Sequence, residues 1–168
     1  MLCAYSTICP RWTLSLASVF LCVSPALANP DHSDHNHATT SVSIGEPGQL
    51  EHVTRTVQVT LYDSMRFVPA KIRVKQGETI RFIVKNAGQL KHEMSLGTLK
   101  QLKEHAELMA RFPDMEHADD NQVTVDPGEE GKIIWKFTEA GPVYFACLQP
   151  GHYEAGMKGT LQVRKAPR

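Results

Sequence analysis

The feature that most constrains the fold of this chain is an alternation of apolar and polar residues with a period of two. The alternation begins at Val53 and recurs in short segments to the C-terminus. Such alternation is typical of β-strands with one buried face, and the segments end at turns rich in Gly, Pro, Asn and Asp. The predicted strands are residues 53–61, 71–75, 79–86, 122–125, 131–137, 143–147 and 159–164, with 67–70 as a short edge piece or turn.

One segment departs from this period. From Thr98 to Phe112, apolar residues such as Leu102, Ala106 and Met109 recur three and four positions apart, and Pro113 follows. This spacing predicts an amphipathic helix that ends before the proline. Seven or eight short strands with regular turns favour an all-β antiparallel sandwich or barrel, here with one helical insertion around residues 98–112.

The first 28 residues are predicted to be a secretory signal peptide. Trp12–Val23 is apolar and uncharged, and Ala26-Leu27-Ala28 fits the small-x-small pattern that precedes a cleavage site. The apolar run is too short to span a membrane comfortably, so we expect export to the periplasm rather than a stable membrane anchor. Cleavage would leave 140 of the 168 residues.

Residues 29–52 are predicted to form a polar, flexible arm in front of a domain that spans residues 53–168. The arm holds Pro and Gly but few apolar residues, which is typical of disordered or loosely docked segments. It also carries His32, His35 and His37 within six positions. Such a tract suggests metal capture, although a solvated tail explains it equally well.

The charge balance excludes some classes of partner. Eighteen basic residues face eighteen acidic ones, and no basic stripe of the kind seen in nucleic-acid-binding proteins stands out. Beyond the N-terminus no apolar run approaches the length of about 18 residues that a membrane-spanning helix needs.

Removal of the signal peptide changes the cysteine count. Cys3, Cys9 and Cys22 are lost with it, and Cys147 remains as a single cysteine in an exported protein. An unpaired thiol in an oxidising compartment needs an explanation. It is a buried bystander, a dimerising thiol, a nucleophile or a metal ligand.

The sequence around Cys147 favours the metal ligand. Cys147, His152 and Met157 follow a C-x4-H-x4-M spacing between two predicted strands, and His92 follows the turn at 86–88 on another part of the sheet. Two imidazoles, a thiolate and a weak axial thioether are the ligands of a type 1 copper site. A zinc site rarely uses Met, and a cysteine hydrolase would need a group to orient its histidine, which the sequence does not show.

The loop, with Tyr144-Phe145 before it and Pro-Gly before His152, resembles the cupredoxin family of blue-copper proteins. Its Cys-to-His spacing is similar to that of rusticyanin. The resemblance covers about residues 53–164 and implies a Greek-key β-sandwich with one copper ion. By motif, the implied ligands are His92, Cys147, His152 and Met157. Glu93 departs from the family pattern, in which Asn or Ser often follows the first histidine.

A second group of soft and imidazole ligands lies in and near the helical insertion. We expect it to offer further copper ligands, as we do for the N-terminal arm. The candidate residues are His32, His35 and His37 in the arm, and Met94, His105, Met109, Met115 and His117 near the insertion. Core packing is the competing explanation for Met109, and simple exposure is the competing explanation for His105.

Three functions differ in how far this sequence supports them. The His-rich arm and the Met/His insertion favour a periplasmic copper-binding protein of copper tolerance, which resembles the bacterial copper-resistance cupredoxins. The alternative is a soluble electron carrier with a redox protein as partner. An enzyme is not expected, because only His35-Asn36-His37 has the His-x-His spacing of which a multicopper oxidase needs several pairs.

Overall fold

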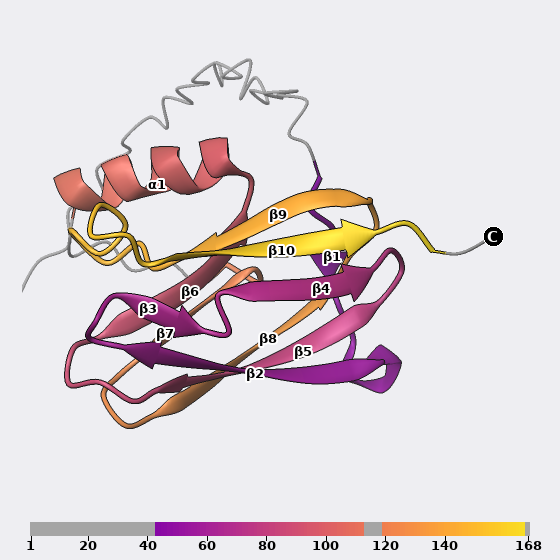
Figure 1. Cartoon of the computed structure of the whole chain (residues 1–168), viewed down its shortest axis with the longest axis horizontal. Coiled ribbons are helices and arrows are strands. Elements are labelled where there is room, and N and C mark those ends of the chain that lie inside the picture. Colours follow the sequence, from indigo (N-terminus) through magenta and orange to yellow (C-terminus); the bar gives the residue numbers. More distant parts are fainter. Residues whose placement is uncertain (1–42, 113–118, 167–168) are drawn as a thin grey trace, which may run out of the picture. The chain divides into compact units, whose positions relative to one another are not determined.

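The structure is a computed structural model that describes residues 43–112 and 119–166. Within them, ten strands form two five-stranded sheets that pack face to face (Figure 1). The first sheet has the strands β1 (Glu46–Pro47), β8 (Glu130–Lys136), β5 (Thr79–Asn86), β2 (Arg55–Tyr62) and β3 (Arg66–Val68), in that order. The second has β4 (Lys71–Lys75), β10 (Lys158–Arg164), β9 (Gly141–Ala146), β6 (His92–Gly97) and β7 (Gln122–Val125). The predicted Greek-key β-sandwich with one helical insertion is confirmed.

The core lies between the two sheets and is filled by the apolar half of each alternating strand. Phe67 and Phe145 meet edge to face with their ring centroids 5.0 Å apart, and Phe82 meets Phe137 in the same way at 6.3 Å. Cys147 lies in this same buried cluster. The apolar alternation therefore places the thiol at the edge of a packed core rather than on the surface.

Two strand pairs are parallel, which corrects the expectation of a purely antiparallel architecture. β2 pairs with β5 in parallel, and β4 pairs with β10 in parallel. The chain crosses from the first sheet to the second between β3 and β4 and returns between β4 and β5. Such crossings allow strands that run in the same direction to become neighbours in one sheet. Local alternation cannot reveal this, because it reports burial and not strand direction.

β6 was not recognisable as an alternating strand, and its burial explains why. All six of its residues are buried. Met94 and Leu96 face the core between the sheets, while the alternate residues face the helix α1 (Leu99–Arg111). A strand that is covered on both faces has no exposed polar half, and the period of two disappears.

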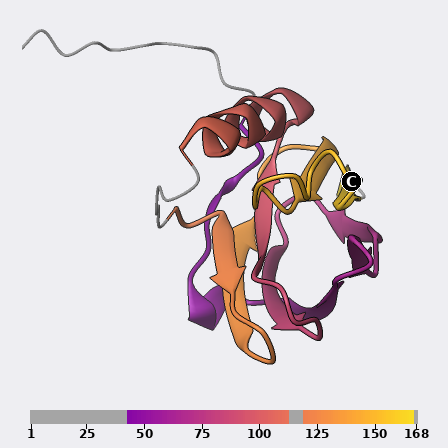
Figure 2. The ribbon, with the colours of Figure 1, turned by 90° about the vertical axis from the view of Figure 1, so that its left-hand side faces the viewer.

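The predicted helix forms α1 and covers the outer face of the second sheet (Figure 2). Thr98 caps its N-terminus in a capping box with Gln101, which satisfies two backbone N–H groups. Leu102, Ala106 and Met109 pack against Ala146, Leu148 and neighbouring side chains of β9. Within the described residues, no helix is both long and apolar enough to cross a membrane.

The last ten residues of the predicted flexible arm, 43–52, are packed against the first sheet. β1 pairs with β8, and the indole N–H of Trp135 donates to the carbonyl oxygen of Ile44 at 3.2 Å. Ile44 itself is buried. A strand of two residues is too short to show periodicity, so this contact could not be predicted from the sequence. Residues 29–42, with the three arm histidines, lie outside the described residues.

Gly159 in β10 illustrates how tightly the core is packed below the loop at 147–157. A Cβ atom at this position would lie 2.0 Å from a carbon of the Phe145 ring, which is itself fully buried. The absence of a side chain at 159 therefore makes room for an aromatic ring two residues before Cys147. The role of Gly159 in this structure is therefore one of packing.

Replacing Gly159 with Ala should lower the free energy of unfolding by about 1–3 kcal/mol, because the ring of Phe145 must move in a core without spare volume. Urea unfolding of the copper-free protein measures this loss. The exposed neighbour Thr160→Ala is the control and should change the stability by less than about 0.5 kcal/mol. Equal stability of the Gly159→Ala variant and the parent protein would show that this contact is not restrictive.

Candidate metal centre

Three of the four predicted copper ligands converge at one end of the sandwich. His92 begins β6, Cys147 follows β9, and His152 lies in the loop between β9 and β10. Their ligand atoms all lie within 4.8 Å of one another. In the part of the chain that the structure describes, no other group of three or more His, Cys, Asp or Glu side chains has the spacing of a metal site.

The distances fit a single ion. The sulfur of Cys147 lies 3.3 Å from Nδ1 of His152 and 3.9 Å from Nδ1 of His92. Two ligands that each bind one first-row metal ion at about 2.0–2.3 Å lie no more than about 4.6 Å apart. The imidazole rings are tilted by 54° with their centroids 5.0 Å apart, so they are not stacked on each other. The donor set of two imidazoles and a thiol therefore fits copper.

The loop that carries Cys147 and His152 is held by its own hydrogen bonds. The N–H of Cys147 donates to the carbonyl oxygen of Met157 at 3.1 Å, and the N–H of Met157 donates to that of His152 at 3.0 Å. Gly151 has a φ of +82°, which a residue with a side chain rarely adopts. Two strands fasten the ends of the loop, so its ligands are held in place before any ion binds.

Met157 begins the return from this loop to β10 and is fully buried. It belongs to the same core cluster as Cys147, and its backbone bonds to both Cys147 and His152. This position beside the ligands is compatible with the weak axial thioether of a type 1 site. Its role as a fourth ligand stays a prediction.

The thiol of Cys147 is strongly affected by its surroundings. Burial raises its pKa to about 12, although the N–H groups of Gln149 and Glu93 act in the opposite direction. The N–H of Glu93 lies 3.3 Å from the sulfur. Without a cation the buried sulfur is therefore a protonated thiol at neutral pH, and a bound metal ion would supply the positive charge that stabilises the thiolate.

His92 is oriented by an aspartate that the sequence did not reveal. Nε2 of His92 lies 2.9 Å from Oδ1 of Asp63, in the turn after β2. The pKa of Asp63 is lowered, chiefly by the N–H of Gln89 and also by His92 and the N–H of Leu90. An ionised carboxylate only accepts hydrogen bonds, so Nε2 carries the proton and Nδ1 presents its lone pair toward Cys147.

The loop before His92 is shaped around this carboxylate. Gln89 and Leu90 donate their N–H groups to Asp63 at 2.7 and 3.2 Å. A Cβ on Gly88 would lie 1.9 Å from the same carboxylate, so a glycine is required for this close approach. The buried Asn86 holds the loop from the other side through the carbonyl oxygens of Leu90 and Val125.

These supporting residues could not be assigned from the sequence. Asp63 is 29 positions from His92, and its only local signal is that of an ordinary turn residue. Asn86 carried a weak signal, since Asn86-Ala87-Gly88 marked the end of a strand. The side-chain amide of Asn86 donates hydrogen bonds to Leu90 and Val125, and the bond to Val125 forms only when the sandwich is folded.

Glu93, the departure from the family pattern, has two separate roles. Its backbone N–H points to the Cys147 sulfur, but its side chain lies on the opposite face of β6 from His92. There its carboxylate accepts a hydrogen bond from the hydroxyl of Ser95, beneath α1. The structure places it behind the strand, from where its charge still raises the pKa of Cys147 after the larger effect of burial.

The candidate second copper ligands are not brought together by the described residues. Met94 lies in the core between the sheets, whereas His105 and Met109 lie on α1, on the other face of the second sheet. Met109 packs into the contact between α1 and β9, and His105 is half-buried. Met115 and His117 lie outside the described residues. Their role in metal binding, and that of the arm histidines, stays a prediction.

Copper binding to this site should release the proton of Cys147. Because the thiol is protonated far above neutral pH, copper(II) affinity should rise by up to about tenfold per pH unit between pH 7 and 9, as proton competition weakens. The pKa of His152 is lowered by burial and by His92, so protons do not compete with copper for this imidazole in the same pH range.

The measurement is a copper(II) titration that follows the intense thiolate-to-copper visible band at several pH values. Cys147→Ser is the control and should lack the band at every pH. An affinity that does not change with pH, or a band that survives in the variant, would contradict the assignment of the thiol.

Replacing Asp63 with Asn should shift the reduction potential of the bound copper to a more positive value. The carboxylate makes His92 a more basic ligand and stabilises copper(II) more than copper(I). A tenfold loss of copper(II) affinity alone corresponds to about 59 mV for a one-electron couple. Voltammetry of Asp63→Asn beside the exposed control Asp120→Asn measures the shift, and equal potentials would show that Asp63 has only a structural role.

Comparison with known proteins agrees with this geometry. Residues 53–164 match the family described as copper binding proteins, plastocyanin/azurin family. The chain is 46% identical to the copper-resistant cuproprotein CopI of Rubrivivax gelatinosus over 90% of this chain and 94% of that protein. It is 34% identical to the CopI of Pseudomonas aeruginosa over 92% and 98%.

Solved structures show the same fold. The chain resembles reduced auracyanin from the photosynthetic bacterium Roseiflexus castenholzii, with a TM-score of 0.57 and 21% identity over 68% of this chain and 99% of that one. It resembles auracyanin B with a TM-score of 0.59 and 22% identity, over 73% and 96%. The match over residues 53–164 and the likeness to the two CopI proteins show that the chain belongs to the plastocyanin/azurin family of copper-binding cupredoxins, a non-enzymatic family.

Proposed function

We propose that this protein binds copper at His92, Cys147, His152 and Met157 and protects the periplasm against excess copper. The observation that carries the proposal is the convergence of two imidazoles and one buried thiol within 4.8 Å at one end of the sandwich. The names of the two CopI relatives support copper resistance as the purpose of that binding, since the likeness spans 90% or more of this chain.

The residues of the site suit both oxidation states of copper. The thiolate of Cys147 is the soft ligand that copper(I) prefers, and the imidazoles of His92 and His152 are the ligands that copper(II) prefers. Copper would supply one-electron redox chemistry to the site. The backbone bonds of the loop and the carboxylate of Asp63 hold these ligands in one arrangement, so an ion can change its oxidation state with little movement of the protein.

Access to the site is one-sided. His92 and Cys147 are fully buried, whereas His152 is only half-buried at the surface. Copper would therefore arrive and leave past His152, and the buried ligands would slow its release. Slow release suits a protein that keeps free copper low.

Electron transfer is the second candidate, and one observation favours it. Tyr62 and Leu90 are 40% and 47% exposed at the same end of the sandwich as the metal ligands. Apolar side chains around a half-buried copper ligand suit brief docking of a redox protein. The metal site is the same in both functions, so the two candidates differ in their partners and in the phenotype of a deletion.

The N-terminal segments complete the proposal. Residues 1–28 would direct export and be removed, and the arm with His32, His35 and His37 would capture copper(II) near the domain. The predicted signal peptide is the feature that supports a periplasmic location.

The test is growth of a deletion strain under copper stress, with wild-type, Cys147→Ser and Glu107→Gln genes restored in turn. Copper tolerance should return with the wild type and with the exposed control Glu107→Gln, and should not return with Cys147→Ser. Respiratory electron flow should be unchanged in all four strains. Loss of electron flow with normal copper tolerance would overturn the proposal in favour of the electron carrier.

A further inference from the structure

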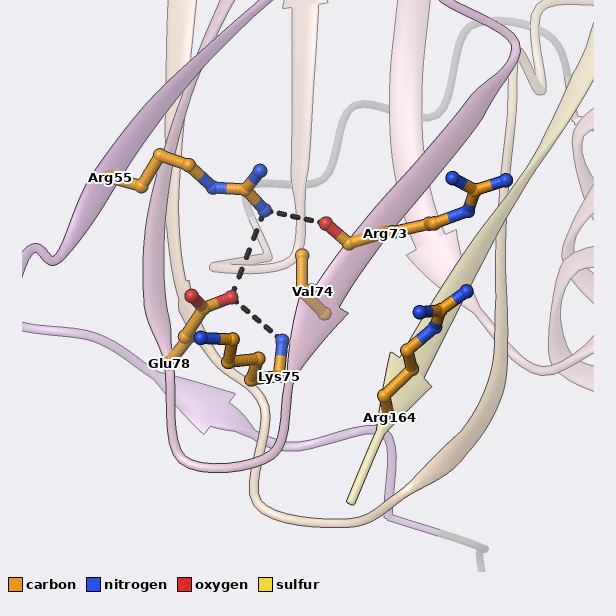
Figure 3. A pocket seen from close by; sticks show the side chains of 6 residues that line it. All are labelled: Arg55, Arg73, Val74, Lys75, Glu78 and Arg164. Carbon is orange, nitrogen blue, oxygen red and sulfur yellow. Dashed lines mark hydrogen bonds and ion pairs between the residues drawn. The ribbon is translucent and has the colours of Figure 1, made fainter. Parts of the chain in front are cut away.

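A second polar site lies at the end of the sandwich opposite the metal ligands. It is a cleft of about 210 Å³ formed where β4 and β10 end and β2 and β5 begin, at the right of Figure 1. Figure 3 shows the six residues that line it, which are Arg55, Arg73, Val74, Lys75, Glu78 and Arg164. Four of the six are cations and one is an acid.

Glu78, the acid of the cleft, already has partners within the protein. Oε2 of Glu78 accepts a hydrogen bond from the N–H of Lys75 at 2.7 Å and lies 3.7 Å from Nη2 of Arg55. The same Nη2 donates to the carbonyl oxygen of Arg73 at 2.6 Å. Arg55 thus reaches from the first sheet to the edge of the second, and its charge is balanced by Glu78.

Three cations remain without an acidic partner. Within residues 43–112 and 119–166, the side chains of Arg73, Lys75 and Arg164 make no ion pair and no hydrogen bond to a carboxylate. In Figure 3 the guanidinium groups of Arg73 and Arg164 extend in the same direction, away from Glu78. The cleft therefore carries an unbalanced charge of about +3.

The strand register places Arg73 and Arg164 on one face. Ile72, Val74 and Val163 are buried, so these two arginines lie on the outer face of the second sheet. The side chain of Lys75 is also exposed but extends toward Glu78 in Figure 3. Arg164 is paired directly with Lys75. The two guanidinium groups of Arg73 and Arg164 carry like charge on this face, so an external anion beside them would supply a counter-charge.

Protection of a sheet edge explains only part of this pattern. β4 is the edge strand of its sheet, and charged residues on an edge prevent pairing with other chains. That reason applies to Arg73 and Lys75. It does not apply to Arg164, because β10 lies between β4 and β9 and has no free edge.

The walls of the cleft are held before any ligand binds. The turn after β4 is closed by the N–H of Glu78, which donates to the carbonyl oxygen of Lys75 at 3.1 Å. The N–H of Gln76 donates to the carbonyl oxygen of Arg164 at 2.7 Å and joins the turn to β10. A ligand would have to order only the side chains, which lowers the entropic cost of binding.

We propose that this cleft binds a phosphate group, with Arg73 and Arg164 as the main contacts and Lys75 as a third charge. The planar fork of an arginine matches two oxygens of a phosphate, and two such forks on one face can hold one group from two sides. The volume is below the roughly 300 Å³ at which pockets for drug-sized ligands begin, so it fits a single phosphate group rather than a large molecule. The group is either free phosphate or the headgroup of an anionic phospholipid.

The first arm of the test uses inorganic phosphate and the full-length exported protein. Isothermal titration should show saturable binding that falls at least tenfold in the double variant Arg73→Gln/Arg164→Gln. The matched control is Lys100→Gln/Lys103→Gln, which removes the same charge from exposed positions on α1 and should bind as the wild type does. An equal loss in both double variants would reduce the effect to net charge and overturn the site.

The second arm identifies the source of the phosphate. Vesicles of phosphatidylglycerol, with phosphatidylcholine vesicles as the control, are mixed with the same three proteins and separated by flotation. Binding that only the arginine variant loses assigns the site to the lipid headgroup, and binding of inorganic phosphate alone assigns it to the free anion. Absence of both interactions in the wild type overturns the proposal.

The result is independent of the metal centre. The visible copper band and the thermal unfolding of each variant should match those of the wild type, because Arg73 and Arg164 are exposed at the far end of the sandwich and Lys100 and Lys103 are exposed on α1. A variant that keeps the copper band and loses phosphate would support the cleft alone. Failure of the copper proposal would leave this test unaffected.

Discussion

Burial of the Cys147 sulfur between two sheets is the constraint on which the rest of the metal centre depends. The thiol is fully enclosed, and a thiolate in an apolar core is unfavourable unless a cation lies beside it. Copper and the fold therefore stabilise the same arrangement. The hydrogen bond from the N–H of Glu93 and the backbone bonds to Met157 hold the sulfur where a metal ion can meet it, and β6, β9 and β10 meet at that point.

The second influence on the site comes from outside the ligand set. Asp63 is on a turn that no ligand occupies, yet it determines which nitrogen of His92 faces the metal. It also receives two N–H groups from the loop before His92, so one carboxylate both orients the ligand and shapes the loop. Carboxylate, imidazole and metal in series are a recurrent way to raise the basicity of a ligand. Here the arrangement joins the turn after β2 to the start of β6.

The two ends of the sandwich have different electrostatic characters. One end gathers two imidazoles and a buried thiol, and the other carries unbalanced arginine and lysine side chains at the strand ends. The overall charge of the chain is zero, so this separation is invisible in the composition. It arises because the parallel pairing of β4 with β10 brings Lys75 and Arg164 to the same position, although they are 89 residues apart in the sequence.

The sequence was sufficient to indicate the strands with one exposed face, a helix around residues 98–112 and the candidate ligands Cys147, His152 and Met157 of the C-terminal loop. Each of these is a local pattern, set by alternation, by helical spacing or by side chains within eleven residues. Only the packed structure shows the course of β6, the docking of β1, the pairing of Asp63 with His92 and the face that Arg73 and Arg164 share. These features depend on contacts between segments far apart in the chain. β6 is buried on both faces, so its sequence lacks the alternation of apolar and polar residues by which a strand is recognised.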